Sequence, residues 1–150
     1  MFVLALTTAI AGVFFGGALY VNLVEHPSRV ACGTPAAVRQ FREMYPRAAA
    51  MMGSLSALGC MMGLVAAWLL RDVHIAVNAI ILGFPVPFTL IVIAPVNRAL
   101  MDPALDASSE RATELLARWL RLHTVRTILG GMAFGLMLFR LVIHGSAGAA

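Results

Sequence analysis

Two histidines in this 150-residue chain lie beside other polar side chains at the edges of long apolar stretches. His26 follows Asn22 at the helical spacing i, i+4, and Glu25 adjoins it, so three polar groups close the first apolar stretch together. His123 precedes Arg126 by three residues at the start of the last apolar stretch. Imidazole and carboxylate groups bind iron, copper or zinc, and with a guanidinium they also form catalytic sites.

Asn97 and Trp119 extend this set if the apolar stretches pack together as helices. Asn97 closes the third stretch, and Trp119 stands one helical turn before His123. The ends of the first, third and fourth stretches then meet at one membrane depth. We therefore predict one mouth of the bundle that holds imidazole, carboxylate, carboxamide, indole and guanidinium groups.

A connector after the first stretch adds a phenol and two more guanidiniums. Thr34 and Pro35 form an N-cap and first-turn pair, which predicts a short amphipathic helix from about Pro35 in a connector that ends near Arg47. In this helix Arg39, Arg42 and Tyr45 follow one another at steps of three and so share one face. We expect the helix to lie over the mouth of the bundle as a lid. The substrate-binding candidates are Asn22, Arg39, Arg42, Tyr45 and Trp119.

Each candidate also has a structural interpretation. His26 before Pro27 can end the first span at the membrane surface, and His123 can be an ordinary interfacial residue. Arg126 lies in an apolar run, where a charge is costly unless it is paired or hydrated, so it can reach the surface or pair with Glu25. The connector arginines can form a solvated basic face.

Glu25, His26 and His123 are a candidate set of metal ligands. No HExxH motif and no haem-attachment motif accompanies them, so we assign no metal site firmly. Cys32 and Cys60 are too few and too far apart for a CxxC redox centre. The cofactor is open at this point: we expect either none or a metal ion.

The composition requires a membrane to surround these residues. The chain is 61% hydrophobic and 12% charged, whereas a soluble domain carries about 25% charged residues. We predict an all-α fold, a bundle of four transmembrane helices that forms a single integral membrane domain over residues 1–150. The spans are expected at about residues 2–24, 48–70, 75–96 and 124–143.

Local patterns add detail to these spans. Pro85, Pro87 and Pro95 predict that the third helix is kinked or opened. An amphipathic stretch from Glu110 is expected to continue directly into the fourth span. We expect residues 145–150 to be disordered.

The arginines predict the orientation. Nine of the eleven lie in or beside the two polar connectors, so the positive-inside rule places both connectors in the cytoplasm and both termini on the other side, in the inner membrane of a bacterium. Because these arginines flank apolar spans, they do not indicate a nucleic-acid partner. His74 and His144 fall on the opposite side, and we assign them no role.

Three spans carry GxxxG motifs, which let helices approach closely. They are Gly12 with Gly16, Gly59 with Gly63 and Gly131 with Gly135. The partners of these faces are either other helices of the bundle or a second copy of the chain, so a homo-oligomer is expected as one outcome.

Four motifs occur in a recognisable order. They are Tyr20 with Glu25-His26-Pro27 and Arg29, then Phe41-Arg42-x-Met44-Tyr45, then Pro95-Val96-Asn97-Arg98, then Trp119-x-x-x-His123-x-x-Arg126-Thr127. In these motifs, over nearly its whole length, the chain resembles the DUF1772, or anthrone oxygenase-like, family of small four-helix membrane proteins. The resemblance implies oxidation of an anthrone to an anthraquinone by O₂, with no established organic cofactor.

That activity would give the polar residues catalytic roles. An anthrone has an acidic methylene group, and the resemblance implies His123 as the base that removes its proton, with His26 as the alternative. Arg126 or Asn97 would stabilise the enolate oxygen, and Glu25 would orient a histidine. The partners would be O₂, a lipophilic substrate and the lipid bilayer.

Three other functions stay open. The chain can be a carrier for a lipophilic metabolite, because broken helices and intramembrane charges also mark transport sites. It can be a metal-dependent redox protein that uses the same histidines. It can also be a structural subunit that docks a partner through its GxxxG faces.

Overall fold

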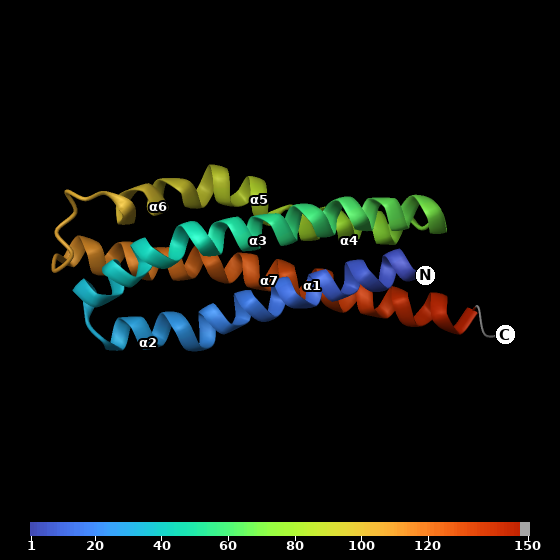
Figure 1. Cartoon of the computed structure of the whole chain (residues 1–150), viewed down its shortest axis with the longest axis horizontal. Helices are drawn as coiled ribbons and strands as arrows, with labels where there is room; N and C mark the ends of the chain where they lie inside the picture. Colours follow the sequence, from blue (N-terminus) through green and yellow to red (C-terminus); the bar gives the residue numbers. More distant parts are fainter. Residues whose placement is uncertain (148–150) are drawn as a thin grey trace.

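The computed structural model describes residues 1–147, and almost all of them are helical. Four helical stretches, each long and apolar enough to cross a membrane, run side by side (Figure 1): Phe2–Ala31, Thr34–Leu70, Val73–Met101 and Glu110–Ser146. No strand occurs in this described part of the chain. The predicted all-α, four-span fold is confirmed, and the protein is an integral membrane protein.

The first stretch extends beyond its predicted end at residue 24. Helix α1 (Phe2–Tyr20) continues through a π-helical turn, η1 (Val21–Glu25), into α2 (His26–Ala31). Pro27 does not end the helical stretch, because it lies in the first turn of α2, where its missing N–H and fixed φ are tolerated. Asn22, Glu25 and His26 therefore lie within a continuous helical path and not at its end.

The predicted connector helix is the beginning of a much longer helix. Helix α3 spans Thr34–Leu70 without a break and contains Pro46 in its interior. Its N-cap is Gly33, at φ 90°, and not Thr34 as the sequence indicated. Glycine suits this position because a positive φ is strained for other residues. The lid and the second membrane span are thus one continuous helix.

The third stretch is broken where its prolines predicted. It consists of α4 (Val73–Gly83), α5 (Pro85–Phe88), the π-helical η2 (Thr89–Ile93) and α6 (Ala94–Met101). In the turn before it, Arg71 is left-handed and Asp72 caps α4 by accepting the backbone N–H of His74 at 2.9 Å.

Helix α7 (Glu110–Ala147) carries the second connector and the fourth span together, as predicted. Ser109 stands just before it, and its Oγ accepts the backbone N–H of Ala112 at 3.2 Å. The expectation of a disordered tail from Gly145 is wrong for residues 145–147, which extend α7, and residues 148–150 lie outside the described residues.

Glycines let α3 and α4 pack closely. A Cβ atom at Gly63 would lie 2.6 Å from Cβ of Ala79, and one at Gly59 would lie 2.5 Å from a side chain of the same helix α4. In contrast, Gly16 and Gly135 have nothing within 4 Å of a built Cβ atom. Part of the GxxxG pattern is therefore used inside the bundle, and self-association stays a prediction.

The two ends of the bundle differ. The N-terminus and the last turns of α7 lie at one end, and both polar connectors lie at the other (Figure 1). At the connector end, α3, α6 and α7 share an apolar cluster that includes Val38, Phe41, Leu100, Leu116 and Trp119. This cluster supports the polar residues described next.

Candidate functional site

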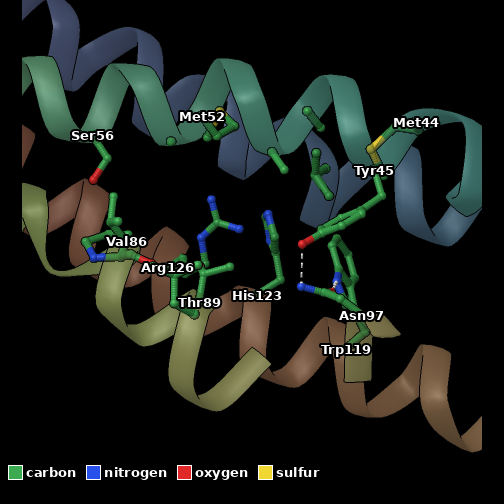
Figure 2. A pocket seen from close by; sticks show the side chains of 16 residues that line it. Met44, Tyr45, Met52, Ser56, Val86, Thr89, Asn97, Trp119, His123 and Arg126 are labelled. Atoms are coloured by element: carbon green, nitrogen blue, oxygen red, sulfur yellow. Dashed lines mark hydrogen bonds between the residues drawn. The ribbon is translucent and has the colours of Figure 1, made fainter. Parts of the chain in front are cut away.

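A cavity of about 170 Å³ lies between α3, the broken α5–η2 region and α7. Figure 2 shows the side chains that line it. Five predicted site residues are among them: Tyr45, Asn97, Trp119, His123 and Arg126. The remaining lining is mostly small or apolar, so the cavity is an apolar space with a few polar groups that α3, α6 and α7 contribute.

His123 is held from two sides. Its Nδ1 lies 2.7 Å from Oδ1 of Asn22, and its ring stacks on the indole of Trp119 at 4.8 Å between centroids. Asn22 does not line the cavity, although it was a predicted substrate contact. Its Nδ2 donates to Oγ1 of Thr124 at 3.1 Å, so Asn22 contacts His123 and the next residue of α7.

Within the part of the chain that the structure describes, Arg126 has no protein partner for its charge. It forms no ion pair within residues 1–147, and its buried Nε has no hydrogen-bond partner there. Figure 2 shows Arg126 and His123 side by side, both pointing from α7 toward α3. The alternative that Arg126 pairs with Glu25 is wrong, because Glu25 accepts from Arg29 at 2.5 Å.

Three further lining residues form a hydrogen-bonded chain. Trp119 donates its Nε1–H to Oδ1 of Asn97 at 3.0 Å, and Asn97 donates its Nδ2–H to the hydroxyl oxygen of Tyr45 at 2.8 Å (Figure 2). Because an indole N–H can only donate, it fixes which end of the Asn97 amide faces Tyr45. The Tyr45 oxygen is therefore an acceptor, and its own hydrogen is left for another group.

His26 lies next to the cavity but does not line it. Its ring is buried and stacks on Trp119 at 5.8 Å between centroids, and its Nδ1 has no partner among the described residues. Arg29, which the sequence did not single out as a site residue, is equally buried and lies 5.8 Å over the Trp119 ring. Its i, i+4 spacing from Glu25 is the signal that indicates the pair.

The candidate metal set is not assembled. No three His, Cys, Asp or Glu side chains in the part of the chain that the structure describes come close enough to hold a metal ion. Glu25 is instead engaged by Arg29 and, at 3.3 Å, by Gln40. The combination of Glu25, His26 and His123 as ligands of one ion is therefore wrong.

The connector arginines lie away from the cavity. Arg42 donates to the backbone oxygens of Leu100 at 3.0 Å and Asp102 at 2.6 Å, so it satisfies carbonyls at the end of α6. Arg39 is exposed. Of the three residues on the predicted lid face, only Tyr45 reaches the cavity.

Two lining hydroxyls were not predicted. Ser56 donates to the backbone oxygen of Leu82 at 2.6 Å, and Thr89 donates to that of Pro85 at 2.7 Å. Both accepting carbonyls lie beside the break between α4 and η2. The prolines indicated the position of the break, because they remove helical N–H donors there, but not these two hydroxyls.

The chain matches one known protein family. Residues 41–136, nearly two thirds of the chain, match the family described as anthrone oxygenase. The matched range contains all five predicted residues that line the cavity. No curated protein and no solved structure matches the chain. On the family match, the chain belongs to the anthrone oxygenase family.

Proposed function

We propose that this protein is a membrane-embedded monooxygenase that uses O₂ to oxidise an acidic carbon of a planar, lipophilic aromatic substrate of the anthrone type. The observation that carries the proposal is the shared wall of one apolar cavity, where a buried imidazole stands beside a guanidinium that has no partner among residues 1–147. Family membership supports the same reaction class.

The first step is removal of a proton from carbon. The methylene group of an anthrone is acidic because its carbanion is delocalised over two aryl rings and onto the ketone oxygen. His123 would be the base, since it lines the cavity and imidazole accepts protons near neutral pH. His26 is the weaker candidate because it does not line the cavity. Its ring stacks on Trp119, which does.

The second requirement is stabilisation of the enolate oxygen. Arg126 offers a charge that no carboxylate of the described chain neutralises, and Tyr45 offers a hydroxyl hydrogen that Asn97 leaves free. Groups that are already oriented in a poorly hydrated cavity stabilise a developing anion more strongly than water does. Asn97 would therefore act through Tyr45 and not by direct contact.

The reaction with O₂ balances without another reductant. The carbanion transfers an electron to O₂, and the resulting radicals combine to form a C–O bond. Return of the first proton gives a hydroperoxide. Loss of the second hydrogen from the same carbon, with cleavage of the O–O bond, forms the ketone and releases water. One oxygen atom thus enters the product and the other becomes water.

The shape of the cavity suits such a substrate. Ala48, Ala49 and Gly53 line it from α3, so a flat ring system can approach this helix closely. A planar apolar compound also partitions into lipid, which surrounds the four spans. With both connectors in the cytoplasm, as we propose from the arginine distribution, the cavity would lie nearer the cytoplasmic leaflet of a bacterial inner membrane.

The test is oxygen uptake by detergent-purified protein given a hydroxyanthrone, with quinone formation followed in parallel. We expect His123→Ala to lower the rate by about 10²- to 10⁴-fold, the usual contribution of general base catalysis. His74→Ala is the matched control, because this exposed histidine lies at the other end of the bundle. A reaction without protein measures spontaneous oxidation.

Three outcomes contradict the proposal in different ways. Wild-type uptake equal to the protein-free rate would remove the anthrone assignment. Full activity in His123→Ala would remove the base assignment only. Tight binding of the hydroxyanthrone with quantitative recovery of unchanged compound would favour a carrier, which the unpaired Arg126 would also suit for an anionic ligand.

A further inference from the structure

The hydrogen bonds around Asn22 determine more than its position. Thr124 donates its hydroxyl hydrogen to the backbone oxygen of Leu120, one turn earlier in α7, at 2.9 Å. A hydroxyl has a single hydrogen, so toward Asn22 the Thr124 oxygen can only accept. The amide end that faces Thr124 at 3.1 Å is accordingly Nδ2, which donates.

In this orientation the amide oxygen of Asn22, Oδ1, faces His123. Oδ1 of Asn22 lies 2.7 Å from Nδ1 of His123, and a carbonyl oxygen can only accept. Nδ1 must therefore carry the hydrogen of the neutral ring. The remaining nitrogen, Nε2, then keeps its lone pair.

We propose that Asn22, oriented by Thr124, is a positioning residue that fixes His123 as the Nδ1–H tautomer and so makes Nε2 the base. The inference rests on the proposed function for its catalytic meaning. Free histidine in water favours the other tautomer, with the hydrogen on Nε2, so the relay from Leu120 through Thr124 and Asn22 reverses the intrinsic preference.

The opposite tautomer meets an unfavourable arrangement at this site. It would bring the lone pair of Nδ1 against the carbonyl oxygen of Asn22. Rotating the amide would avoid that repulsion, but Thr124 would then have to leave Leu120 to donate to Asn22. Either way a hydrogen bond of a half-buried site is lost, which is costly because water replaces it poorly there.

Asn22 also lies where a positioning residue should lie. It contacts His123 from the π-helical turn η1 and does not line the cavity. Substitution should therefore lower kcat and leave KM little changed. This split separates Asn22 from a residue that binds the substrate, which is the role the sequence suggested.

The direct test needs no substrate. Protein labelled with ¹⁵N in its histidines, in lipid nanodiscs at mildly alkaline pH, reports the protonation of each ring nitrogen by its chemical shift. The His123 signals are assigned by comparison with His123→Ala. We expect a protonated Nδ1 and an unprotonated Nε2 in the wild type, and a mixture of tautomers or the Nε2–H form in Thr124→Val.

Thr124→Ser is the matched control, because it keeps the hydroxyl and should keep the wild-type spectrum. In turnover, we expect Thr124→Val and Asn22→Leu to lower kcat about tenfold or more, whereas Asn22→Asp, which keeps an acceptor for Nδ1–H, should retain most of it. Rescue by the acceptor alone would not be expected of a merely structural contact.

The proposal is overturned by an unprotonated Nδ1 in the wild type, by a doubly protonated ring, or by a Thr124→Val spectrum equal to that of the wild type. These outcomes are independent of the assay. If the wild type shows the expected tautomer but does not oxidise the hydroxyanthrone, the proposed function fails and the positioning role of Asn22 stands. Thr124→Val is nearly isosteric, so it serves even if Asn22→Leu does not fold.

Discussion

Two arginines of helix α7, Arg126 and Arg140, lie toward opposite ends of the bundle and have different surroundings. Arg140, near the termini, is ion-paired with Asp72 from the turn between α3 and α4, and His144 lies 2.9 Å from the same carboxylate. Arg126, near the connectors, lines a cavity and has no acidic partner in the described chain.

We propose that the difference separates a structural charge from a functional one. A buried charge is costly unless it is paired, so an arginine that is left without a carboxylate needs another compensation. At the terminal end the compensation is Asp72, which ties the α3–α4 turn to α7. At the connector end we propose that it is the anion that forms during the reaction.

The most direct test of this distinction is to replace each of the two arginines by leucine. Arg126→Leu should lower the oxidation rate by about 10²- to 10³-fold, as expected for loss of a preorganised oxyanion stabiliser. Its thermal stability in detergent should be unchanged or raised. Arg140→Leu should leave the rate per folded molecule unchanged but destabilise the fold by about 3 kcal/mol, because Asp72 loses its cationic partner.

Oxygen uptake and a thermal unfolding curve on the same preparations give both readouts. Arg126→Lys is the conservative variant, and it should recover part of the activity because it keeps the charge but not the planar fork. Equal loss of stability in both leucine variants would contradict the distinction, since it would mean that Arg126 is also structural.

A smaller effect on activity should come from the phenol of Tyr45, which lines the same cavity as Arg126. Tyr45→Phe keeps the ring that stacks on Phe41 and removes only the hydroxyl, so the enolate would lose one donor. We expect a decrease in kcat of about tenfold, the value of one hydrogen bond to a charged group. Tyr20→Phe is the matched control, because Tyr20 is exposed and does not line the cavity. A Tyr45→Phe rate equal to that of the control would leave Arg126 as the sole stabiliser.

The elements of the fold could largely be predicted because each depends on local composition. Apolar runs long enough to cross a bilayer, and prolines inside one of them, produced the four spans and the broken third helix. The ends of helices were harder. Pro27 indicated the end of the first span, yet it is accommodated in the first turn after η1, and Pro46 likewise lies inside α3.

The site was predictable in its residue types but not in its connections. Helical spacing placed Trp119, His123 and Arg126 on one wall of α7. It could not show that Asn22 turns to His123, because that contact depends on how the first helical stretch and α7 rotate against each other. His144 illustrates the same limit: it had no assigned role, although it contacts Asp72 from 72 residues away.

The last expected effect is confined to acid pH and concerns the stability of the terminal end. Burial opposes the charged form of Asp72, but hydrogen bonds from Arg140, His144 and the backbone N–H of His74 outweigh it and lower the pKa of the carboxyl from 3.8 to about 2. A lowered pKa in the folded state stabilises the fold above the unfolded value, and this stabilisation is lost as the pH falls through the folded value. The window is therefore from about pH 4 down to about pH 2.

Asp72→Asn should remove this acid-dependent part of the stability, about 2 kcal/mol for a shift of nearly two pKa units. Thermal unfolding in detergent across that window measures it, as a Tm that falls with pH in the wild type and much less in the variant. Asp106→Asn is the comparison: hydrogen bonds from Ser108 also lower the pKa of this carboxyl, but it is fully exposed and solvent screens it. Equal flattening of the acid dependence by the two variants would show that the Asp72 cluster does not hold the terminal end of the bundle as a buried ion pair should.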